Sequence, residues 1–576
     1  MKRIHISLFF IAILLEGLLA EVILGRMQFD AGRGQIVDYE VLRSICLVAI
    51  GFALVLLVGI WFVMARHGKW IIRICDYLDS RLIGAKKRLF LFQGMTLVLT
   101  AFLVELWLLT FLVIPVPLRP VLIWGVLICC TSWVMLRIIY HAEYHQVPSW
   151  ASRLRAKWNG WLPIQRTTMI VLVVMGLIYF IGFIPTNYRL DANGHFYTHG
   201  DEAVIYPDVA KALVVQGTFS DWVQRVIWDW PWWYGFPYLP ISAAVLVIPR
   251  LLLGNGFFDH IQLNIFLLRQ LISVLPMVLA IILLVYLVNK FKSLWQSVGI
   301  FIFMALLPGV VKFNVRFWHP DSLILLLILF TFYCLQKDRL RYGKYFFLAA
   351  VTCGLATAIK LWGLFFVLAI PGYLLAGVFE KQINLKKMVL LGLGFILAMA
   401  GTIVISSPGL IIPAIQQFAI KLWLQQQNSL LTGYNEPDPE GVYKTGLVNW
   451  LRFFGIFFMK PFFFFSAFLA LLVGSLWGAR KYLNRLILAW SLPATLFLVS
   501  FGAMKSFQYM FPVMIPLYLG AFLLPGLVNG EDVPGTPAIL TRPIVRRTVW
   551  VITVVLFVLQ FGFNLVNLIH SPYLSF

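Results

Sequence analysis

The sequence has few charged residues. Asp, Glu, Lys and Arg make up 12% of its 576 residues, whereas 61% are hydrophobic and the mean hydropathy is +0.88. A soluble domain keeps about a quarter of its residues charged. Because so little polar surface is available, the folded chain cannot be covered by groups that water solvates. The composition therefore predicts an integral membrane protein.

Acidic residues are scarcer still, with 24 Asp and Glu against 46 Lys and Arg, and the formal net charge is +22. Such a surplus can indicate a nucleic-acid-binding protein. Here the basic residues lie in short segments between apolar runs, where Lys and Arg set the orientation of membrane helices. We therefore expect membrane lipids, and no nucleic acid, as the surroundings of the protein.

Cysteine is also rare, and its placement excludes two further classes. The six cysteines are Cys46, Cys75, Cys129, Cys130, Cys334 and Cys353. All lie in or beside apolar runs, and their spacing fits neither a structural metal site nor a disulfide framework. We interpret them as residues of the apolar core.

Apolar runs that approach the length of a membrane span recur along the whole chain. A bilayer core requires roughly 20 apolar residues per helix. About fifteen runs qualify: 6–25, 44–64, 91–114, 120–138, 168–186, 262–288, 295–311, 321–336, 345–359, 361–379, 388–408, 450–475, 487–503, 508–525 and 548–569. The first lacks a convincing cleavage context, so we expect it to be retained. The expected fold is an all-α polytopic membrane protein.

Basic residues gather at alternate connections between these runs, for example at 66–88, 153–166 and 337–344. Because cytoplasmic loops carry an excess of Lys and Arg, this pattern predicts a cytoplasmic N-terminus. The two long polar segments, 187–261 and 409–449, then both lie on the outer face. The chain divides near residue 160, so that residues 1–160 hold four spans of unknown role.

The outer segment 187–261 contains adjacent acids, Asp201 and Glu202, followed by Tyr206 and a predicted helix over Val209–Gln216. Ionisable groups beside a membrane are often functional because they are costly to desolvate. A carboxylate here could take a proton from a hydroxyl as a general base, or bind a divalent ion through oxygen. A solvated loop with ordinary acids is the alternative.

The same segment continues with a dense aromatic stretch over residues 221–238. Such rings suit the apolar faces of sugars, but Trp and Tyr also anchor helices in the headgroup zone, and the second interpretation is favoured. Residues 239–253 are too short and too interrupted to span a bilayer, so they are predicted to form an interfacial helix.

A second polar group is expected on the outer face around residues 312–321. Arg316 and His319 can bind a phosphate through charge and hydrogen bonds. Asp321 heads the next span, where the helix dipole stabilises a carboxylate, and capping alone would explain it. Lys360 closes a helical hairpin on the same face, although snorkelling would also place it there. Together Arg316, His319 and Lys360 would form a cationic pocket for a lipid-linked phosphate.

The other long segment, 409–449, is expected to cover a cavity and to help select an acceptor, because loops longer than about a dozen residues are usually functional or disordered. Its polar residues and aromatics include Asn428, Tyr434, Asn435, Glu436, Asp438, Glu440 and Tyr443.

These features follow one another in a characteristic order over residues 165–525. The order is Asp201-Glu202, Tyr206-x-x-x-Ala210, an aromatic and proline stretch, His319-Pro320-Asp321 at the head of a span, Lys360 in a hairpin, and Gln508-Tyr509-x-x-Pro512-x-x-x-Pro516. This ordered set resembles the GT-C class of membrane glycosyltransferases. It is most similar to the superfamily of protein O-mannosyltransferases and the lipid A aminoarabinose transferase.

The resemblance implies a GT-C-like helix bundle with a catalytic membrane domain over residues 161–576. It implies that Asp201 is the catalytic carboxylate with Glu202 beside it, and that Lys360 contacts the donor phosphate. It further implies substrate-binding roles at the matching positions Asp321, Gln508 and Tyr509, and the other candidate substrate-binding residues are Tyr206, Arg316 and His319. Many members have Arg-Tyr where this chain has Gln508-Tyr509, and Lys505 is the candidate for the missing positive charge.

The implied reaction moves a sugar from a polyprenyl-phosphate donor to a lipid, glycan or protein acceptor, with inversion at the anomeric carbon. We expect no required cofactor, and a requirement for a divalent metal ion is left open. The rival classes are a lipid or solute transporter, a scaffold without activity, and a transferase for whole oligosaccharides. The expected location is a prokaryotic plasma membrane, with the site on the outer face.

Overall fold

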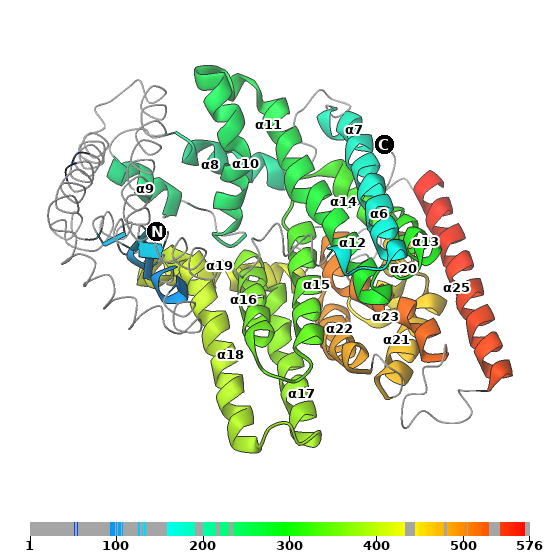
Figure 1. The fold of residues 1–576 in the computed structure, drawn as a ribbon. Helices are drawn as coiled ribbons and strands as arrows, with labels where there is room; N and C mark the ends of the chain where they lie inside the picture. The colour runs from blue at the N-terminus through cyan, green and yellow to red at the C-terminus, as the bar shows by residue number, and fades with distance from the viewer. Residues whose placement is uncertain are drawn as a thin grey trace. The chain divides into compact units, whose positions relative to one another are not determined.

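A computed structural model describes residues 158–189, 200–214, 219–227, 230, 234–432, 444–476, 481–503, 505–528 and 542–570, with isolated positions between 51 and 133 (Figure 1). Within these ranges all regular structure is helical, which confirms an all-α polytopic membrane protein. Apart from isolated residues, the four spans expected in 1–160 lie outside the described ranges.

The helices are bounded as follows. The first group is α6 (Pro163–Gly182), α7 (Ile184–Tyr188), α8 (Gly200–Ala212), α9 (Phe219–Ile227), α10 (Tyr238–Leu253), η3 (Gly254–Asp259), α11 (Ile261–Leu268), η4 (Arg269–Val274), α12 (Leu275–Asn289), α13 (Leu294–Ala305), α14 (Pro308–Arg316) and α15 (Asp321–Asp338). The second is α16 (Lys344–Ile359), η5 (Leu361–Phe365), α17 (Phe366–Phe379), α18 (Leu385–Ser406), η6 (Pro408–Ile411), α19 (Pro413–Thr432), α20 (Leu447–Phe457), α21 (Pro461–Leu476), α22 (Lys481–Phe501), α23 (Phe507–Val528) and α25 (Pro543–His570).

The chain forms two compact units. One comprises Met1–Gly160, Pro207–Trp230 and Val247–Asp259, and the other comprises Trp161–Tyr206, Pro231–Leu246 and His260–Phe576. The second unit contains nearly all of the long apolar helices.

In the described part of the chain, six helical stretches are long and apolar enough to cross a membrane, and two bent pairs raise the number to eight. The six are Pro163–Tyr188, Ile261–Asn289, Leu361–Phe379, Leu385–Ser406, Lys481–Phe501 and Pro543–His570. The bent pairs are α13 with α14, at 66°, and α20 with α21, at 100°. The apolar run 450–475, which the sequence predicts as one span, therefore forms two helices with a sharp break.

The prediction for the helix after the adjacent acids is wrong in its start. The sequence predicted a helix over 209–216. Instead α8 begins at Gly200 and includes Pro207, so Asp201 and Glu202 lie in its first turn. Acidic side chains in a first turn are stabilised by the helix dipole, which favours the earlier start.

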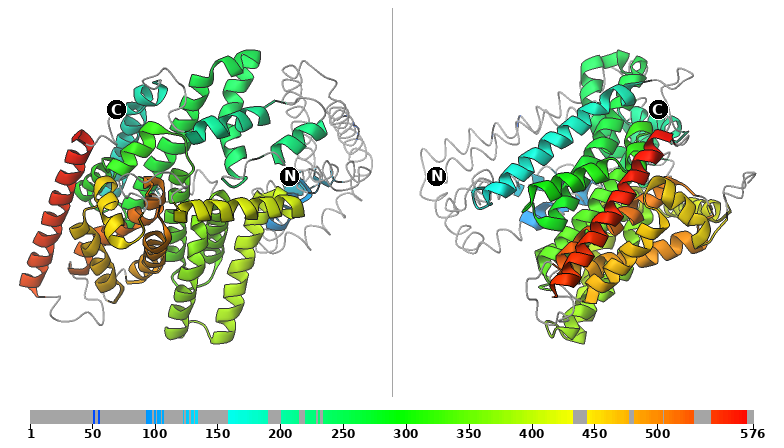
Figure 2. Two further views of the ribbon diagram at one scale, coloured as in Figure 1. Left: turned by 180° about the vertical axis from the view of Figure 1, so that it is seen from behind. Right: turned by 90° about the vertical axis from the view of Figure 1, so that its right-hand side faces the viewer.

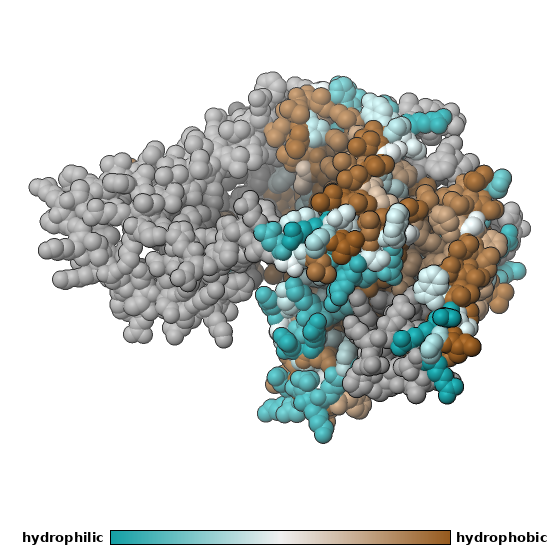
Figure 3. All heavy atoms as spheres, turned by 45° about the vertical axis from the view of Figure 1, so that its right-hand side comes forward, coloured by the Kyte–Doolittle hydropathy of each residue, from teal (hydrophilic) through white to brown (hydrophobic). Residues whose placement is uncertain are grey.

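Burial separates the central helices of the second unit from the peripheral ones. The most apolar windows of α6, α18 and α25 are only 17%, 11% and 17% buried, whereas that of the Ile261–Asn289 stretch is 67% buried. Their exposed residues include many leucine, isoleucine and valine side chains, such as Ile178, Leu397 and Val558. Apolar residues also cover much of the face drawn in Figure 3. These surfaces are suited to lipid.

Around the central stretch, α12 packs against α13 and α15, α15 against α16, and α16 against α18 (Figures 1 and 2). A second group is formed by α21 with α22 and α23. Since α15 and α16 are consecutive and antiparallel, the first residue of α15 and the last residues of α16 lie at the same end of the pair. That end carries Asp321 and Lys360.

The break between α20 and α21 is closed by polar side chains of α25. Gln560 accepts a hydrogen bond from the Lys460 backbone N–H at 2.8 Å and donates one to the Phe458 carbonyl at 3.2 Å. Asn567 donates to the carbonyls of Gly455 and Ile456. Backbone groups freed by a break in an apolar setting must find such partners, so α25 satisfies the bend.

We predict that Gln560→Leu destabilises the protein by about 1–3 kcal/mol. The change leaves the Lys460 backbone N–H without its partner and removes one of the two hydrogen bonds that the Phe458 carbonyl accepts, the other coming from the Tyr518 hydroxyl. Reversible unfolding in mixed micelles measures the change. Val558→Leu, on the exposed face of the same helix, is the control and should have little effect. Equal stability of the two variants would contradict the role given to Gln560.

Candidate active site

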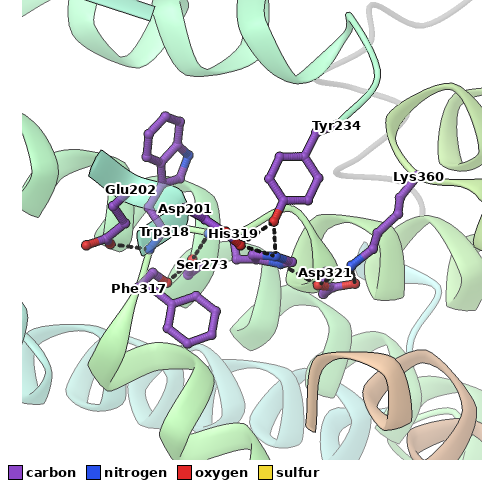
Figure 4. Close-up of polar contacts among 9 residues, drawn as sticks. All are labelled: Asp201, Glu202, Tyr234, Ser273, Phe317, Trp318, His319, Asp321 and Lys360. Carbon is purple, nitrogen blue, oxygen red and sulfur yellow. Dashed lines mark hydrogen bonds and ion pairs between the residues drawn. The ribbon is translucent and has the colours of Figure 1, made fainter. Parts of the chain in front are cut away.

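The candidate site is built by five segments of the second unit (Figure 4). These are the first turn of α8, the turn before α10, the π-helical segment η4, the turn between α14 and α15, and the junction of α16 with η5. They bring together residues that are far apart in the sequence, from Asp201 to Lys360.

A continuous array of polar contacts crosses the site. The Tyr234 hydroxyl lies 2.7 Å from Asp201 Oδ2 and 2.5 Å from His319 Nε2. The other ring nitrogen of His319, Nδ1, contacts Asp321 Oδ2. Lys360 Nζ donates to both oxygens of Asp321, each at 3.1 Å. The array therefore runs Asp201, Tyr234, His319, Asp321, Lys360.

The two ends of this array differ from its middle in exposure. The Asp201 side chain is 38% exposed and that of Lys360 is 17% exposed, whereas His319 and Asp321 are fully buried. A substrate can therefore reach the carboxylate at one end and the ammonium at the other. The buried middle connects them.

Glu202, next to Asp201, has a different environment. Its side chain is fully buried, and its two oxygens accept hydrogen bonds from Arg269 Nε at 2.8 Å and Nη2 at 2.5 Å. It also accepts from the Trp318 backbone N–H at 2.6 Å. Arg269 in turn donates to the Asn187 carbonyl. This geometry gives Glu202 a positioning role, because no oxygen of it faces solvent.

The π-helical segment η4 fixes the turn that carries His319. Ser273, in this segment, donates to the Phe317 carbonyl at 3.1 Å and accepts from the His319 backbone N–H at 3.3 Å. A π-helical turn inserts one residue into a helix and is often found at functional sites. Here Ser273 binds the backbone of the turn directly, whereas Arg269 is connected to it through Glu202, which accepts from the Trp318 N–H.

A close backbone approach holds Tyr234 near Lys360. The Gly235 N–H donates to the Ile359 carbonyl at 2.9 Å. A Cβ at position 235 would lie 1.4 Å from the Ala358 carbonyl oxygen, so only glycine fits. The ammonium of Lys360 also lies 5.7 Å from the centre of the Tyr234 ring and 5.5 Å from that of Tyr509.

Burial determines the charge states in the middle of the array. Burial and the neighbouring Asp201 carboxylate raise the pKa of Tyr234 well above its usual value, so the phenol stays protonated. Burial lowers the pKa of His319, and this effect outweighs the opposing influence of Asp321. A neutral imidazole with Nδ1–H directed at Asp321 and a lone pair on Nε2 is therefore favoured at neutral pH.

The other residues singled out from the sequence are placed as follows. Tyr206 is buried, and its hydroxyl accepts a hydrogen bond from Asn264 at 2.9 Å. Gln508 lies in the first turn of α23 beside Tyr509, and its Oε1 is buried without a hydrogen-bond partner among the described residues. Arg316 ends α14, and its side chain lies outside the described residues.

The Lys505 ammonium donates hydrogen bonds to the carbonyls of Lys444 and Ala503, and its role as a substitute for the missing positive charge stays a prediction. Of the segment 409–449, residues 433–443 lie outside the described ranges, which include Tyr434, Asn435, Glu436, Asp438, Glu440 and Tyr443; Asn428 lies in α19. The predicted lid therefore stays a prediction.

The sequence left a divalent-ion site open at the adjacent acids. Among the described residues no group of three or more His, Cys, Asp or Glu side chains could hold a metal ion. Asp201 and Asp321 are separated by the imidazole of His319. Among the described residues, these two carboxylates therefore do not form a common ligand set.

Three residues of the site escaped the sequence analysis. Tyr234 was hidden in an aromatic stretch that also suits the headgroup zone. Arg269 and Ser273 lie within the apolar run 262–288, which was interpreted only as a span. A charged residue inside a membrane helix usually has a buried partner, and this signal could have identified Arg269 as the partner of an acid.

No protein-family model and no curated protein matches this chain. The chemistry of the site is therefore argued from its geometry.

We predict that Arg269→Met destabilises the protein by about 3–5 kcal/mol, because it leaves the Glu202 carboxylate buried and unpaired. The double variant Glu202→Leu/Arg269→Met should lose less than the sum of the two single changes. Unfolding of Glu202→Leu, Arg269→Met and the double variant in mixed micelles measures the coupling free energy between the two side chains. Simple additivity would show that the two side chains do not stabilise one another.

Proposed function

We propose that this protein is a GT-C-type glycosyltransferase that moves a sugar from a polyprenyl-phosphate donor to a hydroxyl acceptor. The observation that carries the proposal is the array with an accessible carboxylate, Asp201, at one end and an accessible ammonium, Lys360, at the other. A displacement on a sugar phosphate requires both groups. The carboxylate deprotonates the nucleophile, and the cation stabilises the departing phosphate.

In the proposed reaction Asp201 takes the proton of the acceptor hydroxyl as general base. The acceptor oxygen then bonds to the anomeric carbon, and the bond from that carbon to the phosphate oxygen breaks. The electron pair of the broken bond stays on the polyprenyl phosphate. Attack and departure on opposite faces of the sugar invert the anomeric configuration. The phosphate leaves as an anion and needs no proton.

Lys360 supports the departure of the phosphate in this scheme. An ammonium has three N–H donors, and the contacts with Asp321 use two of them. Asp321 fixes the position of the ammonium, so that a further N–H can meet the phosphate. A cation held in advance where negative charge develops is effective because it requires no reorganisation during the reaction.

The position of the Tyr509 ring supports a phosphate-binding role for the end of the array that carries Lys360. It lies beside the Lys360 ammonium, so the late Gln508-Tyr509 pair reaches the same end of the array as the hairpin lysine. Two substrate-binding positions implied by the resemblance, Lys360 and Tyr509, are thus neighbours. A polyprenyl-phosphate headgroup would contact both.

A transporter is the second candidate, and one observation favours it. Two helix pairs, α13 with α14 and α20 with α21, are sharply bent, and discontinuous helices often form the binding sites of transporters. The break at α20 and α21 is filled by α25, however, as Gln560 and Asn567 bond its backbone. Reconstituted protein that moves a polyprenyl-phosphate sugar between leaflets without cleaving it would favour transport.

We predict that Asp201→Asn lowers the rate of sugar transfer about 100- to 10,000-fold, the usual contribution of a general base. Purified protein with synthetic polyprenyl-phosphate sugars and a panel of acceptors provides the measurement, with donor binding followed separately. Asp208→Asn, the same change farther along α8, is the matched control. Equal rates in the two variants would remove Asp201 from the chemistry.

We further predict that Lys360→Met weakens donor binding about 10- to 150-fold, because a hydrogen bond to a charged group contributes about 1.5–3 kcal/mol. Lys421→Met, at an exposed position of α19, is the control. Binding of the neutral polyprenol should be the same in both variants. A loss of affinity for the polyprenol as well would indicate that the change disturbs the lipid site and not the phosphate contact.

A further inference from the structure

The two short contacts of the Tyr234 hydroxyl require more hydrogens than the three groups supply. The phenol oxygen lies 2.7 Å from an oxygen of Asp201 and 2.5 Å from Nε2 of His319. Each short contact needs one hydrogen between its two heavy atoms. A phenol supplies only one hydrogen, so an ionised Asp201 and a neutral His319 leave one of the two contacts without a proton.

The other contacts of His319 do not relieve this shortage. Its Nδ1 faces the Asp321 carboxylate, which also binds the Lys360 ammonium, so Nδ1 carries a hydrogen directed at Asp321. Among the described residues, the third charged group that influences the ring is Asp201, whose Oδ2 is 3.7 Å from Nε2. The neighbouring rings of Phe313 and Phe317 supply no proton.

One added proton completes both contacts, and it can be placed in two ways. Either Asp201 is protonated and donates to the phenol, which donates to Nε2, or His319 is protonated and donates to the phenol, which donates to Asp201. The two arrangements differ only by the concerted shift of two hydrogens. Both form the same two hydrogen bonds.

We infer that Asp201, Tyr234 and His319 form one proton-accepting unit, in which the Tyr234 phenol lets the carboxylate and the imidazole share a single proton. This inference rests on the proposed function for its role in catalysis, but not for its test. Tyr234 is a positioning residue in this unit, since it acts through Asp201.

The unit explains how a partly exposed aspartate can act as a base. A lone aspartate is a weak base near neutral pH because its usual pKa is about 4. In the proton-deficient unit, the hydrogen taken from the acceptor hydroxyl completes two hydrogen bonds at once. The acceptor O–H bond breaks, the proton is bound between Asp201 and His319, and the sugar–phosphate bond breaks as described above. The proton then leaves to solvent through the exposed side of Asp201.

The test measures the protonation of both ends of the unit, and it needs no turnover. Asp and His are labelled with ¹³C in the full-length protein in detergent micelles, and the two signals are assigned with Asp201→Asn and His319→Gln. In the wild-type protein the Asp201 and His319 signals should change together at one common pH midpoint, because they report one macroscopic proton.

In Tyr234→Phe the midpoints of the two signals should separate by about one pH unit or more, as expected for groups that titrate independently. Tyr238→Phe is the matched control, because the Tyr238 hydroxyl is buried without a hydrogen-bond partner among the described residues. It should keep the common midpoint. Separate midpoints in the wild-type protein, or a common midpoint that survives Tyr234→Phe, would overturn the inference whether or not the protein transfers sugars.

Discussion

Arg269 and Glu202 form a bidentate ion pair from which solvent is excluded, and four segments of the second unit meet on it. Glu202 belongs to the first turn of α8 and binds the Trp318 backbone, while Arg269 belongs to η4 and binds the Asn187 carbonyl. The pair therefore sets the distance between Asp201, one residue before Glu202, and His319, one residue after Trp318. A buried pair of this kind adds little net stability, because desolvation offsets most of its attraction. Its value here is geometric, since it fixes one arrangement of two segments.

The bilayer makes such arrangements necessary, because backbone and side-chain polar groups inside it must be satisfied by the protein. The same constraint acts at the break between α20 and α21, where Gln560 and Asn567 serve the exposed backbone groups. Both places contain polar residues within apolar helices, but they differ in access. Gln560, at the break, is fully buried, whereas the array ends in the partly exposed side chains of Asp201 and Lys360. Access, rather than polarity alone, separates a candidate site from a structural contact.

Composition and apolar periodicity were enough to predict the all-α membrane fold, because both follow from the solvent that the chain must face. They also marked Asp201, His319, Asp321 and Lys360, since charged groups beside spans are costly and stand out. Composition and periodicity could not predict the tertiary contacts of these residues. The sequence alone does not distinguish the adjacent acids Asp201 and Glu202. Their roles differ because Arg269 pairs with Glu202, and this contact is known only from the structure. The sharp break at 458–460 was missed because the apolar run continues through it, and the partners that stabilise the break lie about 100 residues later in α25.

The division of roles between the two acids has a chemical reason. A base that meets an acceptor must be accessible, yet an accessible carboxylate is well hydrated and only weakly basic. Burial would raise its basicity but close it to the substrate. The proposed proton-accepting unit separates the two requirements. Asp201 is accessible, while His319 is fully buried behind it, so that a proton would be bound between three groups. The fixed distance between α8 and the His319 turn is then a requirement of the proposed chemistry, and the Arg269–Glu202 pair fixes this distance.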